Sequence, residues 1–411
     1  MLKKSLCRYT HLSHLMQPSI LLQKIKTTDP YIRKIRGYLH EHPEKSLQEY
    51  ETSKFLRAEI AKRGLPVTMV SDTGFFAVLD TGRAGKTIGL RTDMDALPVQ
   101  EHPYNLKQRK KWISQKEGVS HVCGHDAHMA VLLGAIQILC DIKDQLRGKI
   151  IFIFEAAEEI VGGVDDMLEA LAHLHPDAIY GNHVYAAMPA GEICIDSGAI
   201  MAGMACVEFD VTGRGGHASR PDLSINPVFA AAHVLTGISV AWHNQLDVTK
   251  TVSLGISRIH GGETNNVFPN SVFIGGTLRF LDRNEGEKAV RVITRMAENI
   301  ARAHRCTVLL RQAGIVLGPV VNDATLSDMA REAVRELFPG KLVTGNNWYA
   351  SEPFSKYATL APSVFALIGA GNAALGTGAE HHNDRFDVDE DALPYALGAM
   401  TGFTVRFLNS S

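Results

Sequence analysis

Short apolar runs rich in β-branched residues alternate with helical patterns along this chain, and this alternation constrains the fold more than any other feature. Patterns with helical spacing include TSKFLRAEIAKRG (52–64) and residues 129–142. The apolar runs end in polar or glycine-rich clusters and are KTIGLRTDMDALP (86–98), KIIFIFEAAEE (149–159), DAIYGNHV (177–184) and SVFALIGAG (363–371). Alternating strands and helices predict an α/β catalytic domain with a mainly parallel central sheet flanked by helices, whose ligands bind beyond the carboxyl ends of the strands.

The middle of the chain has a different order of strand and helix patterns. Its patterns follow the order strand, helix, strand, strand, helix, strand in residues 206–216, 226–242, 251–262, 271–282, 286–305 and 306–312. This is the split βαβ order of a ferredoxin-like α+β sandwich. Because the alternation of strand and helix patterns resumes afterwards, we predict an inserted domain at 204–315 within a catalytic domain formed by 28–203 and 316–411.

Charge and cysteine usage limit the partners. The net charge of −2 offers no field that would attract nucleic acid or an anionic membrane, so we expect a small-molecule substrate. The six cysteines are scattered over 411 residues, which favours reduced thiols and a cytoplasmic location. The first 28 residues lack the continuous apolar core of a signal peptide, and we expect no membrane span.

The segment HVCGHDAH (121–128) concentrates metal-binding side chains just before an apolar helical pattern. If the segment is extended, Cys123 and His125 face the same point, and Gly124 lets the backbone come close. Thiolate and imidazole are ligands of the zinc class. Taken alone, the pair has a simpler alternative, a buried cysteine beside a helix-capping histidine.

Further candidates follow the other predicted strands. Glu158 and Glu159 would point to opposite sides of a strand, so one can bind a metal while the other faces the cleft. His183 follows the next strand, and His381 and His382 stand together near the C-terminus. With Cys123 and His125, these side chains suffice for two metal ions that share a bridge.

Eight motifs occur in an order that resembles the M20 metallopeptidase and aminoacylase family, and in particular its amidohydrolase branch of N-acyl-amino-acid, hippurate and indole-acetyl-amino-acid hydrolases. The resemblance starts near residue 30, includes LHEHPEKSLQE (39–49), and runs to the end of the chain. The motifs are RTDMDALP (91–98), HVCGHDAH (121–128), EAAEE (155–159), GNHV (181–184), GRGGHASRP (213–221), NNVFPNSV (265–272), GTLR (276–279) and HHNDRFDVDE (381–390).

The resemblance implies a role for each matching residue. Two divalent ions, zinc or manganese with cobalt or nickel as alternatives, would be held by Cys123 as the bridge together with His125, Glu159, His183 and His382. His382 is preferred to His381 because it lies four residues before Phe386, although His381 stays an alternative. Glu158 would be the general base, Asp95 would support the ligands, His217 would assist catalysis, and Asn266 and Arg279 would bind the substrate. The inserted domain would also be a lid and the surface of a homodimer.

Several of these residues have structural alternatives. Asp95 could cap a helix that begins near Ala96, and the glycines before His217 could only form a turn. Arg279 could be a surface residue in a salt bridge. Asp126 and His128 are expected to support the helix start or the ligands rather than to bind metal.

These residues predict a dinuclear metal-dependent amidohydrolase that cleaves N-acyl amino acids to a carboxylate and a free amino acid. One alternative is a dipeptidase or carboxypeptidase of the same superfamily, for which Glu352 is the candidate partner of a free α-amino group. Pro353 stands where the family commonly has aspartate, which leaves a carboxylate contact there open. The other alternative is a non-catalytic metal- or ligand-binding protein.

Overall fold

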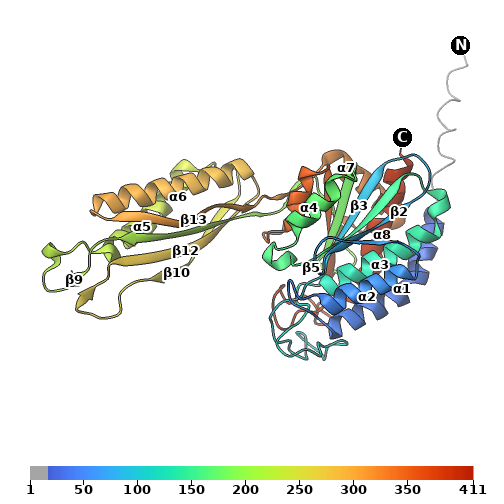
Figure 1. Ribbon diagram of the computed structural model, residues 1–411, viewed down its shortest axis with the longest axis horizontal. Helices are drawn as coiled ribbons and strands as arrows, with labels where there is room; N and C mark the ends of the chain where they lie inside the picture. Colours follow the sequence, from blue (N-terminus) through green and yellow to red (C-terminus); the bar gives the residue numbers. More distant parts are fainter. Residues whose placement is uncertain (1–16, 411) are drawn as a thin grey trace, which may run out of the picture. The chain divides into compact units, whose positions relative to one another are not determined.

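The computed structural model describes residues 17–410, which form two compact units (Figure 1). The large unit contains the described residues up to 198 together with 322–346 and 356–410, and the small unit contains 199–321 and 347–355. The predicted boundaries, at 203/204 and 315/316, fall on strands of the small unit. Most of the N-terminal segment analysed for a signal peptide, including Cys7, lies outside the described residues.

The large unit is built on an eight-stranded sheet with the order β1-β2-β4-β3-β5-β16-β6-β15. Its four central strands, β4, β3, β5 and β16, run parallel to one another, while β1, β2 and β6 introduce antiparallel pairs. The strands are β1 (Val67–Met69), β2 (Phe75–Asp80), β3 (Thr87–Asp93), β4 (Lys149–Glu155), β5 (Ala178–Pro189), β6 (Ile193–Cys194), β15 (Leu342–Val343) and β16 (Ser363–Gly371). The predicted α/β class with a mainly parallel sheet is confirmed.

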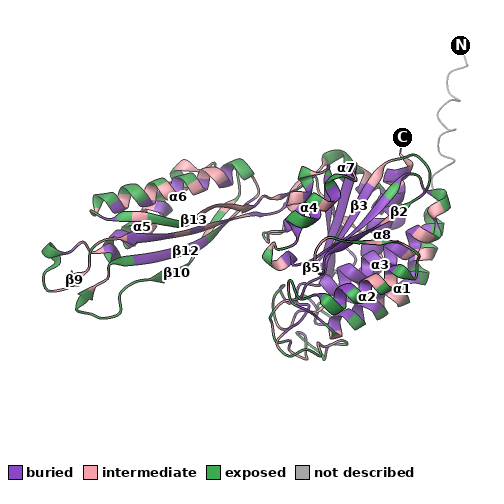
Figure 2. Cartoon of the chain, viewed as in Figure 1, coloured by how far each residue is buried: buried purple, intermediate pink, exposed green. Residues whose placement is uncertain are grey.

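Helices cover this sheet and complete the core. Among the described residues, α3 is buried along almost its whole length, as the strands beneath it are (Figure 2). It packs against α1 and α8, and α7 packs against α8. The helices are α1 (Pro18–Glu41), α2 (Tyr50–Ala61), α3 (His125–Asp141), α4 (Val164–Ala172), α7 (Ala324–Leu337) and α8 (Leu393–Asn409). Because α3 is apolar on all sides, its N-terminal residues are drawn into the interior with it.

The small unit has the predicted ferredoxin-like topology. Its four-stranded antiparallel sheet has the order β10-β12-β8-β13, with helices α5 and α6 packed against it. The elements are β7 (Gly198–Met201), β8 (Gly203–Thr212), β9 (Gly216–His217), α5 (Pro227–Gln245), β10 (Val252–His260), β11 (Val267–Phe268), β12 (Ser271–Phe280), α6 (Arg283–Ala303), β13 (Thr307–Leu317) and β14 (Val320–Asn322). Its core is separate from that of the large unit.

The cysteines and the lengths of the helices bear on the expectations of reduced thiols and of no membrane span. All five cysteines among residues 17–410 are free thiols. In that same part of the chain, every helix is too short or too polar to cross a lipid bilayer.

Candidate metal centre

Cys123 and His125 come together through a turn and a helix start, not through an extended segment as predicted. Gly124 adopts a left-handed φ of 89° and is the N-cap of α3, which begins at His125 rather than near Met129. A Cβ atom at Gly124 would lie 2.4 Å from Cγ2 of Val184. Glycine is therefore required both by the backbone conformation and by the close approach to β5.

Glu158 and Glu159 also lie outside the strand on which they were predicted. Strand β4 ends at Glu155, and the two acids occupy a short 3-10 helix, Glu158–Ile160. Ala157 and Val161, which flank this helix, have left-handed φ angles of 55° and 56°. Such angles are costly for residues with a side chain, above all for a β-branched one, and persist where surrounding contacts impose them. Both carboxylates consequently face the same cluster as His125, with Glu158 Oε2 3.9 Å and Glu159 Oε1 3.7 Å from its Nε2 atom.

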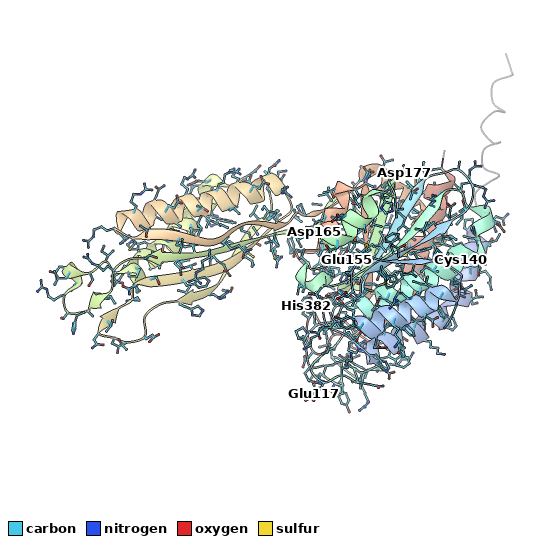
Figure 3. All side chains as sticks on the ribbon, in the orientation of Figure 1. Glu117, Cys140, Glu155, Asp165, Asp177 and His382 are labelled. Carbon is cyan, nitrogen blue, oxygen red and sulfur yellow. The ribbon has the colours of Figure 1, made fainter. Side chains whose placement is uncertain are left out.

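The structure brings all five predicted ligands into two overlapping groups. In one, Cys123 lies with His125 and His183, and in the other it lies with Glu159 and His382. Within each group the candidate ligand atoms are within 4.8 Å of one another. His382, labelled in Figure 3, reaches the cluster from the C-terminal segment, and its Nε2 lies 3.4 Å from Glu159 Oε2. Cys123 is shared by the two groups, as a bridging ligand must be.

The hydrogen bonds leave ligand atoms available for metal. His125 Nδ1 donates to the backbone oxygen of Asp95 at 2.9 Å, and its Nε2 is buried without a hydrogen-bond partner among the described residues. Glu159 Oε1 is also buried without a hydrogen-bond partner among the described residues. Burial disfavours the charged form of His125, but the carboxylates of Asp93 and Asp95 outweigh it and raise the pKa to about 10. The cluster is therefore one that attracts positive charge, and its residues fit divalent cations.

His183 is oriented by a chain of contacts that the sequence analysis did not identify. Its Nδ1 donates to the carbonyl of Val184, whose N–H donates to His128 Nε2 at 2.9 Å. His128 Nδ1 in turn donates to Asp93 at 2.8 Å, and Asp93 is bound by the buried Arg91. This arrangement directs His183 Nε2 toward Cys123, with 3.6 Å between Nε2 and Sγ. Asp93 belongs to the same motif as Asp95 and ends a predicted strand. That position was the sequence signal that could have identified Asp93 as a support for the ligands.

Asp95 supports two elements of the cluster and caps no helix at Ala96, where the structure has a β-bridge instead. Its Oδ2 atom accepts the N–H of Glu159 at 3.1 Å and the hydroxyl of Ser46 at 2.6 Å. Ser46 belongs to the motif 39–49, but nothing in its local sequence showed this contact. Asp95 thus connects His125, through its own carbonyl, to the backbone of Glu159.

The two adjacent histidines near the C-terminus differ in their surroundings. His381 is buried, and its Nε2 accepts the N–H of Ala186 at 3.1 Å. Burial lowers the pKa of His381 to about 3, so its ring is neutral. His382 has a left-handed φ of 66° and a side chain that is 53% exposed. Of the two, His382 is the one grouped with Cys123 and Glu159.

Asp126 supports the start of α3, as predicted, and does so from the side of α1. Its Oδ2 atom accepts from Arg36 Nε at 3.1 Å and from His40 Nδ1 at 2.9 Å. His40 Nε2 also contacts Glu101, so both ring nitrogens face carboxylates, which outweigh burial and raise its pKa to about 9. The buried ion pairs fix α1 against the residues that follow His125.

The other predicted residues belong to the small unit. His217 lies on β9, paired with β11, and its Nδ1 accepts from the hydroxyl of Ser219 at 2.8 Å and from its backbone N–H at 3.1 Å. Nδ1 is therefore an acceptor, and the N–H of the ring is on Nε2. The backbone oxygen of Asn266 accepts from Ala218 N–H, which places Asn266 beside His217. Arg279 is half-buried on β12 and donates to the Ser351 hydroxyl at 2.8 Å, so its partner is neutral and is not the salt bridge given as its structural alternative.

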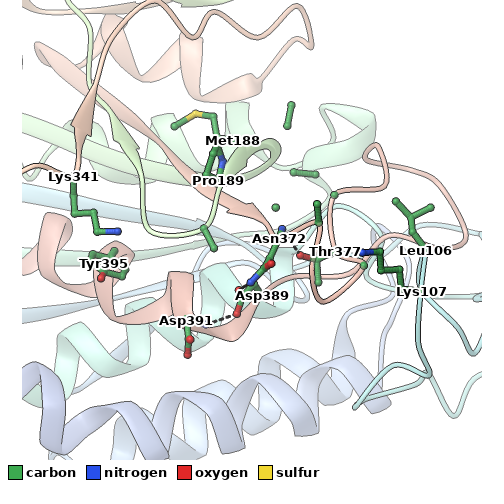
Figure 4. Close-up of a pocket in the computed structure, with 17 residues that line it drawn as sticks. Leu106, Lys107, Met188, Pro189, Lys341, Asn372, Thr377, Asp389, Asp391 and Tyr395 are labelled. Carbon is green, nitrogen blue, oxygen red and sulfur yellow. Dashed lines mark hydrogen bonds between the residues drawn. The ribbon is translucent and has the colours of Figure 1, made fainter.

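A separate pocket of about 890 Å³ opens beyond the ends of β5 and β16 (Figure 4). Lys341, Asn372, Thr377 and Tyr395 line part of it. None of the predicted ligands or catalytic residues is among its lining residues. The site of interest is thus the buried cluster around Cys123.

Comparison with known proteins gives a consistent family. The pattern of peptidase family M20/M25/M40 matches residues 89–405. The chain is 34% identical to the IAA-amino acid hydrolase ILR1-like 2 of Arabidopsis thaliana, covering 91% of this chain and 84% of that protein. It is 31% identical to thermostable carboxypeptidase 2 of Saccharolobus solfataricus, covering 95% and 98%. The crystal structure of YXEP from Bacillus subtilis, a dinuclear metal binding peptidase from the M20 family, matches with a TM-score of 0.81 at 29% identity, covering 94% and 100%.

Substitution of Gly124 by alanine should weaken metal binding. The added methyl group would meet Val184, and a φ of 89° is strained for alanine, so the turn between Cys123 and His125 should shift and we expect zinc affinity to fall about tenfold or more. Calorimetric zinc titration of the metal-free protein measures this. Gly118→Ala is the matched control, because Gly118 has a φ of 69° but no atom near an added Cβ. Equal zinc affinities in the two variants would contradict the role of the close approach.

Proposed function

Because this chain belongs to the M20/M25/M40 peptidase family, and is a metal-dependent hydrolase of amide bonds, we propose that it cleaves N-acyl amino acids to a carboxylate and a free amino acid. One observation carries the proposal: a second carboxylate, Glu158, stands beside the convergent ligand cluster. Its Oε2 atom lies 3.9 Å from His125 Nε2. A cluster that only stored metal would not need a further acid at this position.

The proposed ligands are Cys123, His125, Glu159, His183 and His382, with Cys123 as the bridge. Two divalent ions, when bound, would supply the Lewis acidity that lowers the pKa of water and polarises an amide carbonyl. The thiolate and imidazoles favour zinc, and the carboxylate is compatible with manganese, cobalt or nickel. Asp95, Asp93 and His128 hold the ligand side chains in the required orientations.

Glu158 is proposed as the general base and acid. Its carboxylate accepts a proton from the attacking water and returns that proton to the nitrogen of the leaving amino acid. The strained 3-10 turn carries both acids, and in this proposal Glu159 is a ligand while Glu158 transfers the proton.

Two residues of the small unit are proposed to bind the substrate, with His217 assisting. Arg279 offers a planar guanidinium to the free carboxylate of the amino acid, held by Ser351, and Asn266 adds a neutral donor. His217 carries its proton on Nε2 and can donate it as a hydrogen bond to the developing oxyanion.

Within one small unit, His217 and Arg279 cannot serve the same small substrate. Arg279 lies eight residues along β12 from Ser271, which is on the side of the β9–β11 pair, so roughly 26 Å of strand separates these two regions. We therefore propose a homodimer in which the small unit of one copy supplies His217 to the other. The exposed edge strand β10 and the apolar groove lined by Leu235, Ile238, Trp242, Leu254 and Ile256 support association through this unit. Analytical ultracentrifugation tests this, and a monomer at micromolar concentration contradicts it.

The carboxypeptidase relative favours a second candidate, a peptidase acting on unblocked peptides. In the structure, Glu352 is buried and accepts the N–H of Phe354 at 2.9 Å. A carboxylate used in this local contact is poorly suited to bind a substrate α-amino group, so the acyl amino acid is preferred.

Turnover of a small panel separates the two candidates. We expect the zinc- or manganese-loaded enzyme to hydrolyse N-acetyl-methionine and hippurate at least tenfold faster, in kcat/KM, than unblocked dipeptides. Hippurate should also be preferred to its carboxamide, since the amide lacks the charge that Arg279 would recognise. Activity confined to dipeptides would overturn the proposal.

Replacement of Glu158 by glutamine should separate chemistry from metal binding. The amide keeps the shape but cannot accept a proton, so kcat for hippurate should fall by a factor of about 100 or more. Metal analysis should still find two ions per chain, because Glu158 is outside the ligand set. Glu159→Gln is the matched comparison and should lose metal. Unchanged kcat in Glu158→Gln would remove Glu158 from the base role and favour a non-catalytic protein if the wild type is equally inactive.

A further inference from the structure

His381 lies against the proposed metal centre, but the proposed function gives it no task. Its ring is buried, whereas the neighbouring His382 is half-exposed. The ring of His381 is held between those of Phe386 and His183, with centroid distances of 4.7 Å and 5.3 Å. A buried imidazole fixed beside a ligand requires a physical explanation.

Both ring nitrogens of His381 have partners that define the tautomer. The backbone N–H of Ala186 can only donate, so Nε2 is the acceptor and carries no proton. Because Nε2 is the acceptor, the N–H of the ring is on Nδ1. This Nδ1 faces Cys123, with 3.8 Å between Nδ1 and Sγ, and the backbone oxygen of Cys123 is a second acceptor for the same side chain. The ring therefore presents an N–H donor to Cys123, shared between its sulfur and its backbone oxygen, and presents no lone pair to a metal.

The sulfur is the atom on which both ligand groups depend. Cys123 is common to the group with His125 and His183 and to the group with Glu159 and His382. The sulfur lies 3.6 Å from His183 Nε2 and 3.8 Å from His381 Nδ1, and of these two nitrogens only the second is an N–H donor when His183 binds metal. A hydrogen bond to sulfur both fixes its direction and withdraws electron density from it. The loop that carries the two histidines is fixed to the same segment, because His382 N–H donates to the Val122 carbonyl at 2.9 Å.

We propose that His381 is a positioning residue that donates an N–H···S hydrogen bond to Cys123 and thereby sets how tightly the pair of ions is held. The adjacent histidines thus have different tasks: His382 binds metal, and His381 orients the bridging sulfur. This inference rests on the proposed function, since it assigns a role relative to the metal-bridging thiolate.

Two substitutions separate the donor from the acceptor of this ring. In His381→Asn the side-chain amide N–H takes the place of Nδ1–H, while the acceptor for Ala186 is lost. In His381→Gln the carbonyl oxygen takes the place of Nε2, while the donor to sulfur is lost. We expect zinc affinity, measured by competition with a chromogenic chelator, to stay near wild type in His381→Asn and to fall about tenfold in His381→Gln.

The absorption spectrum of the cobalt-loaded protein gives a second readout that is independent of activity. Loss of the hydrogen bond raises the energy of the sulfur electrons, so the thiolate-to-cobalt charge-transfer band should move to longer wavelength in His381→Gln and stay in place in His381→Asn. Phe386→Leu is the packing control, because it removes a ring contact of His381 without removing the N–H donor. It should lower the melting temperature without moving the band.

Other results would overturn the inference. If His381→Gln keeps the wild-type zinc affinity while His381→Asn loses it, the ring serves only to accept the N–H of Ala186. Loss of one zinc equivalent in both variants would show that His381 is itself a ligand. If either variant fails to fold, the protonation of the two ring nitrogens of His381 is measured in the zinc-loaded wild type by nitrogen NMR with labelled histidine. A protonated Nδ1 on His381 supports the inference, and a metal-bound Nδ1 overturns it.

The proposed function fails separately. A wild type that binds fewer than two ions, or that does not hydrolyse acyl amino acids, contradicts the proposed function. A wild type that binds two ions and hydrolyses hippurate, with a His381→Gln variant that matches it in affinity and spectrum, contradicts only the role of His381.

Discussion

The burial of several lone-pair donors around one point is the constraint on which the large unit depends. Cys123, His125 and Glu159 bring sulfur, nitrogen and oxygen atoms together where solvent is largely excluded, and two of these atoms have no hydrogen-bond partner among residues 17–410. Polar groups buried without partners cost several kcal/mol each, and a buried carboxylate costs more. Such a cluster persists when cations compensate the charge, which is why the surrounding scaffold is best explained as a support for two bound ions.

That support comes from contacts behind the ligands. Asp95 fixes His125 and the Glu159 backbone, and the chain from Arg91 through Asp93 and His128 fixes the peptide beside His183. Left-handed backbone at Ala157, Val161 and His382 stores strain at the same place. Strained residues held by buried ion pairs are typical of sites that must be rigid before the ligand arrives.

The small unit carries the residues proposed to contact the substrate. It has a core of its own, and the five proposed ligands all belong to the large unit. Along β12, Arg279 is distant from the end that carries the β9–β11 pair, so the substrate roles proposed for Arg279 and His217 require two copies of the chain. Under the proposed function, the dimer is therefore part of the active site, and association and catalysis are linked.

The order of apolar runs was enough to predict the parallel sheet, the inserted ferredoxin-like unit and the end of β3 at Asp93. His183, predicted to follow a strand, lies within β5 and is paired with Leu367 of β16, because β5 continues to Pro189. Periodicity could not predict that Cys123 and His125 meet through a left-handed glycine, or that Glu158 and Glu159 follow β4 on a 3-10 turn. Both geometries are imposed by neighbours distant in sequence, Val184 in the first case and Glu49 and Asp95 in the second.

The sequence by itself determined which residue types are available as ligands, base and substrate contacts, because these depend on side-chain chemistry and on motif order. Only the tertiary structure decided which nitrogen of His125 and of His183 faces the ligand cluster, and it decided the different surroundings of His381 and His382. Tautomers depend on long-range partners such as Ala186 and Asp95, whose proximity is created by packing of the sheet and α3 and leaves no mark in the local sequence.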